Sequence, residues 1–266
     1  MVEIYNIYSY LLYEIIEKAK KFIDINDPNF KREILEKLCK YSANSEYLNK
    51  ANVLLNEIFK GYTLYGCYTA LIEMQLKSRA ITGINQDFAY VPFEVGINFD
   101  MLLSIPYIPG SSIKGAVKAA WGVIKRRNLG DREFYEADEQ KLFGAEKQAG
   151  SIIFSDAFPV KPGRKGFILY PDVITPHYSV GGEDILNELD AHPNPIPHLS
   201  IAPETIFSFV IAIPKRISGL DMGEAKKIFK NVLKALNVAL KLGIGARTNV
   251  GYGRFELKRL KICSPR

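Results

Sequence analysis

The chain has 266 residues, of which 47% are hydrophobic and 12% aromatic, enough apolar material for one large domain or two small ones. No apolar run is long enough to span a membrane, and the apolar N-terminus lacks the basic and small-residue features of a signal peptide, so we expect a cytoplasmic protein. The three cysteines are too far apart for a zinc site or a disulfide framework, and a net charge of +6 is by itself weak evidence for a nucleic-acid partner.

Residues 1–60 are predicted to form helices. Apolar residues recur every three or four positions from Ile4 to Phe22, and the sequence NDPN then breaks the pattern. Two further helices are expected over about 29–41 and 45–60. We therefore predict that 1–60 is a helical segment packed on a main domain of residues 61–266.

From Gly61 onward the sequence changes to a mixture of strands and helices. Alternating apolar and polar residues predict a strand around 71–77, and a basic amphipathic helix follows over 111–127. Further strands are expected over 150–160, 166–175, 204–214 and 254–262, with a long helix over about 221–242. The order βαββαβ predicts an α+β fold of the ferredoxin-like, RRM-like type. Its inserted connections are long, above all the polar, Pro-rich stretch from Val180 to Pro203, which is expected to be a functional loop.

The stretch YIPGSSIKGAVKAAW, residues 107–121, places a turn in front of the basic helix. Ser111 or Ser112 is expected to cap the helix, because the first N–H groups of a helix lack partners. From residue 111 to residue 127 there are five bases and no acid, and a helix N-terminus also favours anions. We therefore predict a phosphate contact at Ser111, Ser112, Lys114 and Lys118.

The stretch LGIGARTNVGYGRFELKR, residues 242–259, is rich in glycine. Such a loop can cradle phosphates with its backbone N–H groups, while its polar side chains supply further donors and its tyrosine a ring for base stacking. The spacing and the position after a helix exclude a P-loop and a dinucleotide fingerprint. The predicted RNA-contacting residues are Gly243, Gly245, Arg247, Thr248, Asn249, Gly251, Tyr252 and Arg254.

These residues also have plain structural interpretations. Lys114 is alternatively a solvated lysine, residues 247–249 a self-satisfied turn, and Tyr252 a core aromatic at the start of the last strand. Asp156 fits a turn cap or a strand-end hydrogen bond better than a catalytic carboxylate. The spacing of His177, His192 and His198 matches no metal motif, so we expect no metal, no cofactor and no catalytic residue.

The segments IPGSSIKGAVKAAW and GIGARTNVGYGRF together resemble the RAMP superfamily, the repeat-associated RNA-binding proteins of CRISPR systems. KLFG at 141–144, GSIIFSDAFP at 150–159 and PDVITPHY at 171–178 narrow the resemblance to the sixth RAMP subunits of Cmr, or type III-B, effector complexes. The similarity extends over about 61–262. It aligns the family's IPGSS-x-KG turn with Ile108–Gly115 and its closing glycine-rich loop with Gly243–Gly253; Lys118 stands where relatives often have arginine.

The resemblance implies a non-catalytic subunit that binds CRISPR RNA near the 3′ end of the guide and caps the filament of backbone subunits. Target RNA cleavage would then belong to another subunit. The implied partners are CRISPR RNA, target RNA, neighbouring RAMP backbone subunits and a small helical subunit of the Cmr complex, with no membrane.

Two alternatives remain at this point. The first is a RAMP endoribonuclease that processes precursor CRISPR RNA, with one of the three histidines as the base. The second is the terminal subunit of a Csm, or type III-A, complex, against which the DVITPHY segment argues.

Overall fold

The computed structural model describes residues 6–22, 24–41, 45–83, 88–129, 139–175, 177–178, 192–193, 195–214 and 222–265. The acidic stretch at 181–191 and much of the connection expected from Val180 to Pro203 lie outside the described residues.

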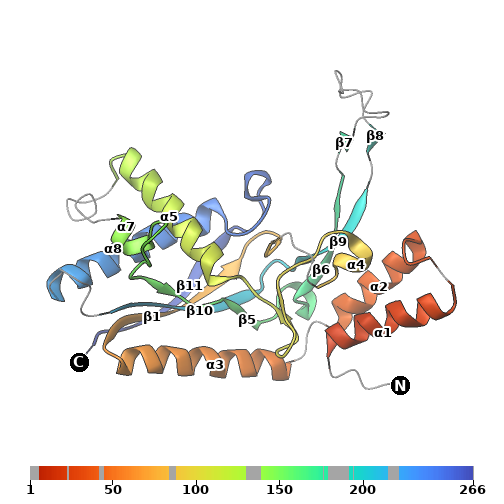
Figure 1. The fold of residues 1–266 in the computed structure, drawn as a ribbon, viewed down its shortest axis with the longest axis horizontal. Coiled ribbons are helices and arrows are strands. Elements are labelled where there is room, and N and C mark those ends of the chain that lie inside the picture. The colour runs from red at the N-terminus through yellow and green to blue at the C-terminus, as the bar shows by residue number, and fades with distance from the viewer. Residues whose placement is uncertain are drawn as a thin grey trace.

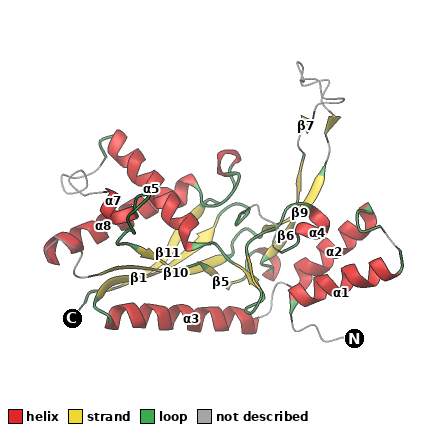
Figure 2. Cartoon of the chain, in the orientation of Figure 1, coloured by secondary structure: helices red, strands yellow, loops and turns green. Residues whose placement is uncertain are grey.

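A five-stranded sheet forms the centre of the molecule (Figures 1 and 2). Its order is β11–β1–β10–β4, with β5 also paired to β10, and every pairing is antiparallel. The central strand β10 is buried over Phe207–Ile213, which explains its nearly continuous apolar sequence. The strands are β1 (Cys67–Leu76), β4 (Ile153–Phe154), β5 (Phe158–Lys161), β10 (Ile206–Pro214) and β11 (Phe255–Cys263).

Two helices, α5 (Gly110–Arg126) and α8 (Met222–Leu242), lie on one face of this sheet and pack against each other (Figure 1). Each buries one apolar stripe at helical spacing. In α5 this stripe includes Trp121, which is fully buried, and in α8 it includes Ile228 and Val232. Both predicted helices are confirmed to within one residue at each end.

Helix α3 (Ser45–Leu64) covers the opposite face of the sheet (Figure 1). It buries Leu48, Ala51, Leu55 and Phe59, which share one side of the helix. Together with buried residues of β3 (Ile105–Pro106) and β5, three of these side chains form a second, smaller core. The helix runs through the predicted segment boundary at residues 60–61 and ends four residues later.

A two-stranded arm of β6 (Leu169–Ile174) and β9 (Ile196–Ile201) stands beside the sheet and continues into β7 (His177–Tyr178) and β8 (His192–Pro193) (Figure 1). Helices α1 (Ile7–Lys20) and α2 (Pro28–Tyr41) lie at the base of this arm, and α2 contacts both β6 and β9. The N-terminal helices thus separate into a pair at the arm and α3 under the sheet.

Strand β9 corrects the expectation of a continuous loop from Val180 to Pro203. Its sequence, IPHLSI, carries a proline, a histidine and a serine and does not alternate clearly, yet His198 and Ser200 are buried. The strand predicted over 150–160 is likewise divided into β4 and β5. The break lies at Ser155, where the side-chain oxygen accepts the Val210 N–H and replaces a ladder bond.

Short elements fill the remaining connections. They are α4 (Tyr90–Phe93), β2 (Phe99–Asp100), β3 (Ile105–Pro106), α7 (Glu139–Phe143) and the 3-10 turns η1 (Arg164–Gly166) and η3 (Thr248–Val250). Among the described residues, no helix combines the length and hydropathy needed to cross a bilayer.

Candidate nucleic-acid interface

The start of α5 is capped differently from the prediction. The helix begins at Gly110 with Pro109 in the capping position, so Ser111 and Ser112 lie inside the first turn and neither caps it. The Gly110 N–H instead donates to Asp156 Oδ1 over 2.7 Å. Glycine is required here because a Cβ would collide with the Phe154 carbonyl oxygen. Asp156 is thus a capping residue, one of the two roles its sequence favoured.

Lys114 and Lys118 follow on the same side of α5, four residues apart. Burial lowers the pKa of Lys114, and the positive charge of Lys118 lowers it further. The Lys118 ammonium donates to the Gly144 carbonyl over 3.4 Å. Because these two like charges repel each other, an anion placed between them would be favoured electrostatically.

The glycine-rich loop between α8 and β11 folds back on itself. Gly243, Gly245, Gly251 and Gly253 all have positive φ angles, as the sequence predicts for such a loop. At Gly253 the chain also packs too closely for a side chain, because a Cβ there would collide with the Ile244 carbonyl oxygen. Arg247 also adopts a left-handed conformation, with φ of 59°, and leads into the turn of Thr248–Val250.

Most backbone N–H groups of the loop donate within the protein. Ile244 donates to Gly253, Ala246 to the Ile81 carbonyl, and Gly253 to the Arg79 carbonyl. Those donors already have acceptors, so they do not contribute to a phosphate cradle. Contact with an anion therefore falls mainly to the side chains of Arg247, Thr248, Asn249 and Arg254; Arg247, Asn249 and Arg254 are exposed.

A buried carboxylate holds the loop in place. Asp172 on β6 is only 5% exposed and accepts hydrogen bonds from the Arg79 guanidinium and, over 2.9 Å, from the Tyr252 hydroxyl. The Arg247 guanidinium lies over the Tyr252 ring, 5.6 Å from its centroid. Tyr252 is therefore neither a free stacking platform nor a purely apolar core residue: its hydroxyl anchors the loop to the arm and its ring supports Arg247.

His198 lies opposite Asp172 in the β6–β9 pairing and is fully buried. Neither ring nitrogen has a hydrogen-bond partner among the described residues. Burial lowers its pKa, which outweighs the opposing effect of the Asp172 carboxylate. The sequence did not identify Arg79, Asp172 and His198 as a group, since they are far apart in the chain and only the strand pairing brings them together.

The predicted residues thus form two clusters. The α5 cluster (Ser111, Ser112, Lys114 and Lys118) lies in a helix that contacts β4, and the loop cluster (residues 243–254) contacts β6 and the segment after β1. Helix α8 connects them, since it packs on α5 and leads directly into the loop.

The three histidines lie on three strands of the arm. His177 and His192 lie in the paired strands β7 and β8, with register partners Pro193 and Tyr178, whereas His198 is enclosed at the base of the arm. Among the residues that the structure describes, no group of three or more potential ligands is arranged to hold a metal ion.

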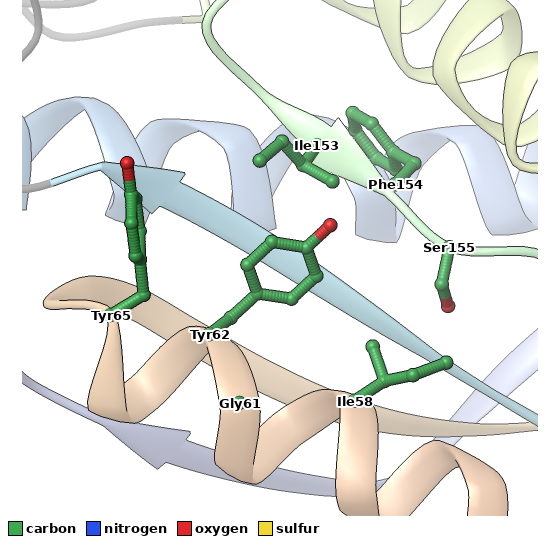
Figure 3. Close-up of a pocket in the computed structure, with 7 residues that line it drawn as sticks. All are labelled: Ile58, Gly61, Tyr62, Tyr65, Ile153, Phe154 and Ser155. Atoms are coloured by element: carbon green, nitrogen blue, oxygen red, sulfur yellow. The ribbon is translucent and has the colours of Figure 1, made fainter.

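An apolar pocket of about 560 Å³ lies between the end of α3 and strand β4 (Figure 3). It is lined by Ile58, Gly61, Tyr62, Tyr65, Ile153, Phe154 and Ser155. No charged side chain lines it, and none of the predicted RNA-contacting residues does. The pocket is therefore unsuited to binding a phosphate.

Comparison with known proteins gives a consistent result. Residues 92–256 match the family model described as the RAMP superfamily. The chain is 33% identical to the CRISPR system CMR subunit Cmr6 of Saccharolobus solfataricus, over 93% of this chain and 78% of that protein. It is 24% identical to the Cmr6 subunit of Pyrococcus furiosus, over 84% of this chain and 78% of the relative.

A solved structure is similar as well. A chain in the cryo-EM structure of the type III-B Cmr-beta bound to cognate target RNA superimposes with a TM-score of 0.69 and 33% sequence identity. The match covers 88% of this chain and 73% of the other.

Proposed function

The chain belongs to the RAMP superfamily, and on this premise we propose that it is a Cmr6-like subunit of a type III-B CRISPR effector complex that binds the CRISPR RNA. The observation that carries the proposal is the 33% identity to a Cmr6 subunit over 93% of the chain.

We also assign the sheet to the ferredoxin-like, RRM-like type. In chain order the central elements are β1, α5, the β4–β5 segment, β10, α8 and β11, a βαββαβ sequence. The first strand lies between the last strand and β10, and both helices cover the same face. This arrangement supports the assignment, while the arm, α1 and α2 are additions to it.

The proposed role is a structural one, near the 3′ end of the guide, where the subunit caps the filament of RAMP backbone subunits. CRISPR RNA, target RNA, those neighbouring subunits and a small helical subunit are its partners. A guide changes sequence from one complex to the next, so the contacts must be made to phosphate and not to particular bases. The half-buried Lys114 and the exposed Lys118, Arg247 and Arg254 suit that requirement.

We propose that the subunit itself does not cleave RNA. A general base must reach the proton it removes, and His198 is enclosed in the protein. Asp156, which lies at the start of α5, already accepts the Gly110 N–H as a helix cap. No observation favours the endoribonuclease or the Csm alternative over this role.

The test is RNA binding and RNA integrity measured together. Purified protein is titrated with labelled single-stranded RNA at several salt concentrations, with and without a divalent metal. We expect intact RNA, a steep salt dependence, and weaker binding by the Lys114→Gln and Arg247→Gln variants. Specific cleavage of the RNA, or binding that ignores both substitutions, would contradict the proposal.

A further inference from the structure

We propose that a row of lysines along α8 binds the phosphates of an RNA strand, as a surface additional to the two clusters. The row consists of Lys226, Lys230, Lys234 and Lys241. The inference rests on the proposed RNA-binding function and extends it, because it assigns a path for the strand that the family motifs do not mark.

The geometry of the row follows from how α8 packs. The helix buries Ala225, Ile228, Val232, Ala235 and Ala239 toward the sheet and α5, so these lysines are all exposed on its other side. The first three are spaced four residues apart, about 6 Å along the axis, and the whole row extends about 22 Å. Positive charge thus recurs along a straight surface of considerable length.

The charge of α8 is not balanced within the helix. Its sequence holds five lysines and a single acid, Glu224. Lys226, Lys230 and Lys241 have no salt-bridge partner in the part of the chain that the structure describes. Like charges four residues apart destabilise a helix, so this arrangement is unfavourable for the isolated protein.

Helix α3, on the other face of the sheet, shows the contrast. It has two lysines and two glutamates, and each lysine pairs within the helix: Lys50 with Glu46 at 2.7 Å and Lys60 with Glu57 at 2.6 Å. In α2, Lys37 likewise pairs with Glu33 at 2.8 Å. Helix α3 therefore balances its own charges, whereas α8 carries positive charge in excess.

A phosphodiester strand is the partner that fits this row best. It repeats one negative charge at short intervals, as the row repeats a positive one, and lysine ammoniums contact phosphates as point charges without reading sequence. The row also leads toward further positive charge, because α8 continues directly into the loop that carries Arg247 and Arg254. On the same face of the sheet, α5 adds four bases and no acid. An acidic protein surface is the rival partner, and the experiment separates the two.

The experiment measures the affinity of the full chain for a labelled, mixed-sequence single-stranded RNA as a function of salt. The test variant is Lys226→Gln/Lys230→Gln/Lys241→Gln. The control, Lys40→Gln/Lys50→Gln/Lys60→Gln, removes the same charge from α2 and α3. Circular dichroism checks that both variants are folded, which we expect because all six side chains are exposed.

We expect the test variant to bind more weakly and the slope of log affinity against log salt to fall by about 2, since each single-strand phosphate contact contributes about 0.7. The control should keep the wild-type slope.

An unchanged slope in the test variant overturns the inference, and weaker capture of other complex subunits by that variant would assign the row to a protein. If Lys114→Gln and Arg247→Gln still weaken RNA binding, the proposed function survives that result. If the wild-type chain binds no RNA, both proposals fail.

Discussion

The glycine-rich loop and the start of α5 are attached to the protein in different ways. Eight N–H groups of residues 243–254 donate to acceptors in the protein, and Tyr252 is anchored to the buried carboxylate of Asp172. The start of α5 is an ordinary helix end, whose first N–H is capped by the exposed Asp156. The loop therefore depends on residues distant in sequence, whereas the α5 cluster depends mainly on its own helix.

Because of this difference, we expect the loop to be more sensitive to substitution of its supporting residues than the start of α5. Side chains on a helix keep their direction when a neighbour is changed, because the backbone hydrogen bonds hold them. The loop has hydrogen bonds of its own, but the N–H groups of Ala246, Gly253 and Arg254 donate to the segment after β1, so part of its support comes from outside. We therefore expect substitutions under the loop to cost more stability than equivalent substitutions under α5.

The largest effect is expected at Asp172. Its replacement by alanine leaves the Tyr252 hydroxyl and the Arg79 guanidinium without their acceptor, and we expect the free energy of unfolding to fall by about 2–4 kcal/mol. Asp156→Ala, the matched change under α5, removes one exposed cap and should cost about 1 kcal/mol. Urea unfolding of both variants measures the difference. Equal losses would remove the distinction between the two regions.

A smaller effect is expected at Gly253. Alanine there combines a left-handed φ of 66° with a collision between its Cβ and the Ile244 carbonyl oxygen. We expect a loss of about 2–3 kcal/mol, against about 1 kcal/mol for Gly251→Ala, where φ is also positive but the space is open. Thermal unfolding compares the two. If both substitutions cost the same, close packing of the loop is not what requires glycine at position 253.

The smallest effect is expected at His198, and it concerns how the free energy of unfolding depends on pH. Its pKa in the folded protein lies below the ordinary 6.5, so below that pH the unfolded chain binds the proton more readily. The free energy of unfolding should therefore fall as the pH drops below about 6.5. The charged neighbours Asp172, Arg79 and Arg247 act on the same group, so the comparison is between wild type and His198→Asn. Parallel pH profiles for the two proteins would contradict this prediction.

Regular elements were predictable from the sequence because their signals are local. The apolar stripes of α8 and α5 and the continuous apolar run of β10 each lie within one segment, and all three elements are confirmed. Strand β9 was missed because its buried face includes His198 and Ser200, which conceal the alternation. The Asp156 cap was among the roles its sequence favoured, but its partner, Gly110, lies 46 residues away.

Of the candidate site, only the residues that belong to recognisable sequence motifs were predictable. The composition of the glycine-rich loop indicates its positive φ angles, yet several of its N–H groups donate to acceptors outside it, in the segment after β1 and in α8. Asp172 was visible only as part of a family motif, and its contacts with Arg79 and Tyr252 require the strand pairing and the folded loop. Interactions between residues so far apart in the chain leave no periodic signal.

The most direct test of the RNA-binding account is photo-crosslinking of the purified chain to single-stranded RNA carrying 4-thiouridine, followed by identification of the crosslinked peptides. The account predicts crosslinks in the peptide that contains the start of α5, around Lys114, and in the peptide that contains the loop of Gly243–Gly253. Crosslinks confined to α3 and the opposite face of the sheet, or none at either cluster under binding conditions, would contradict it.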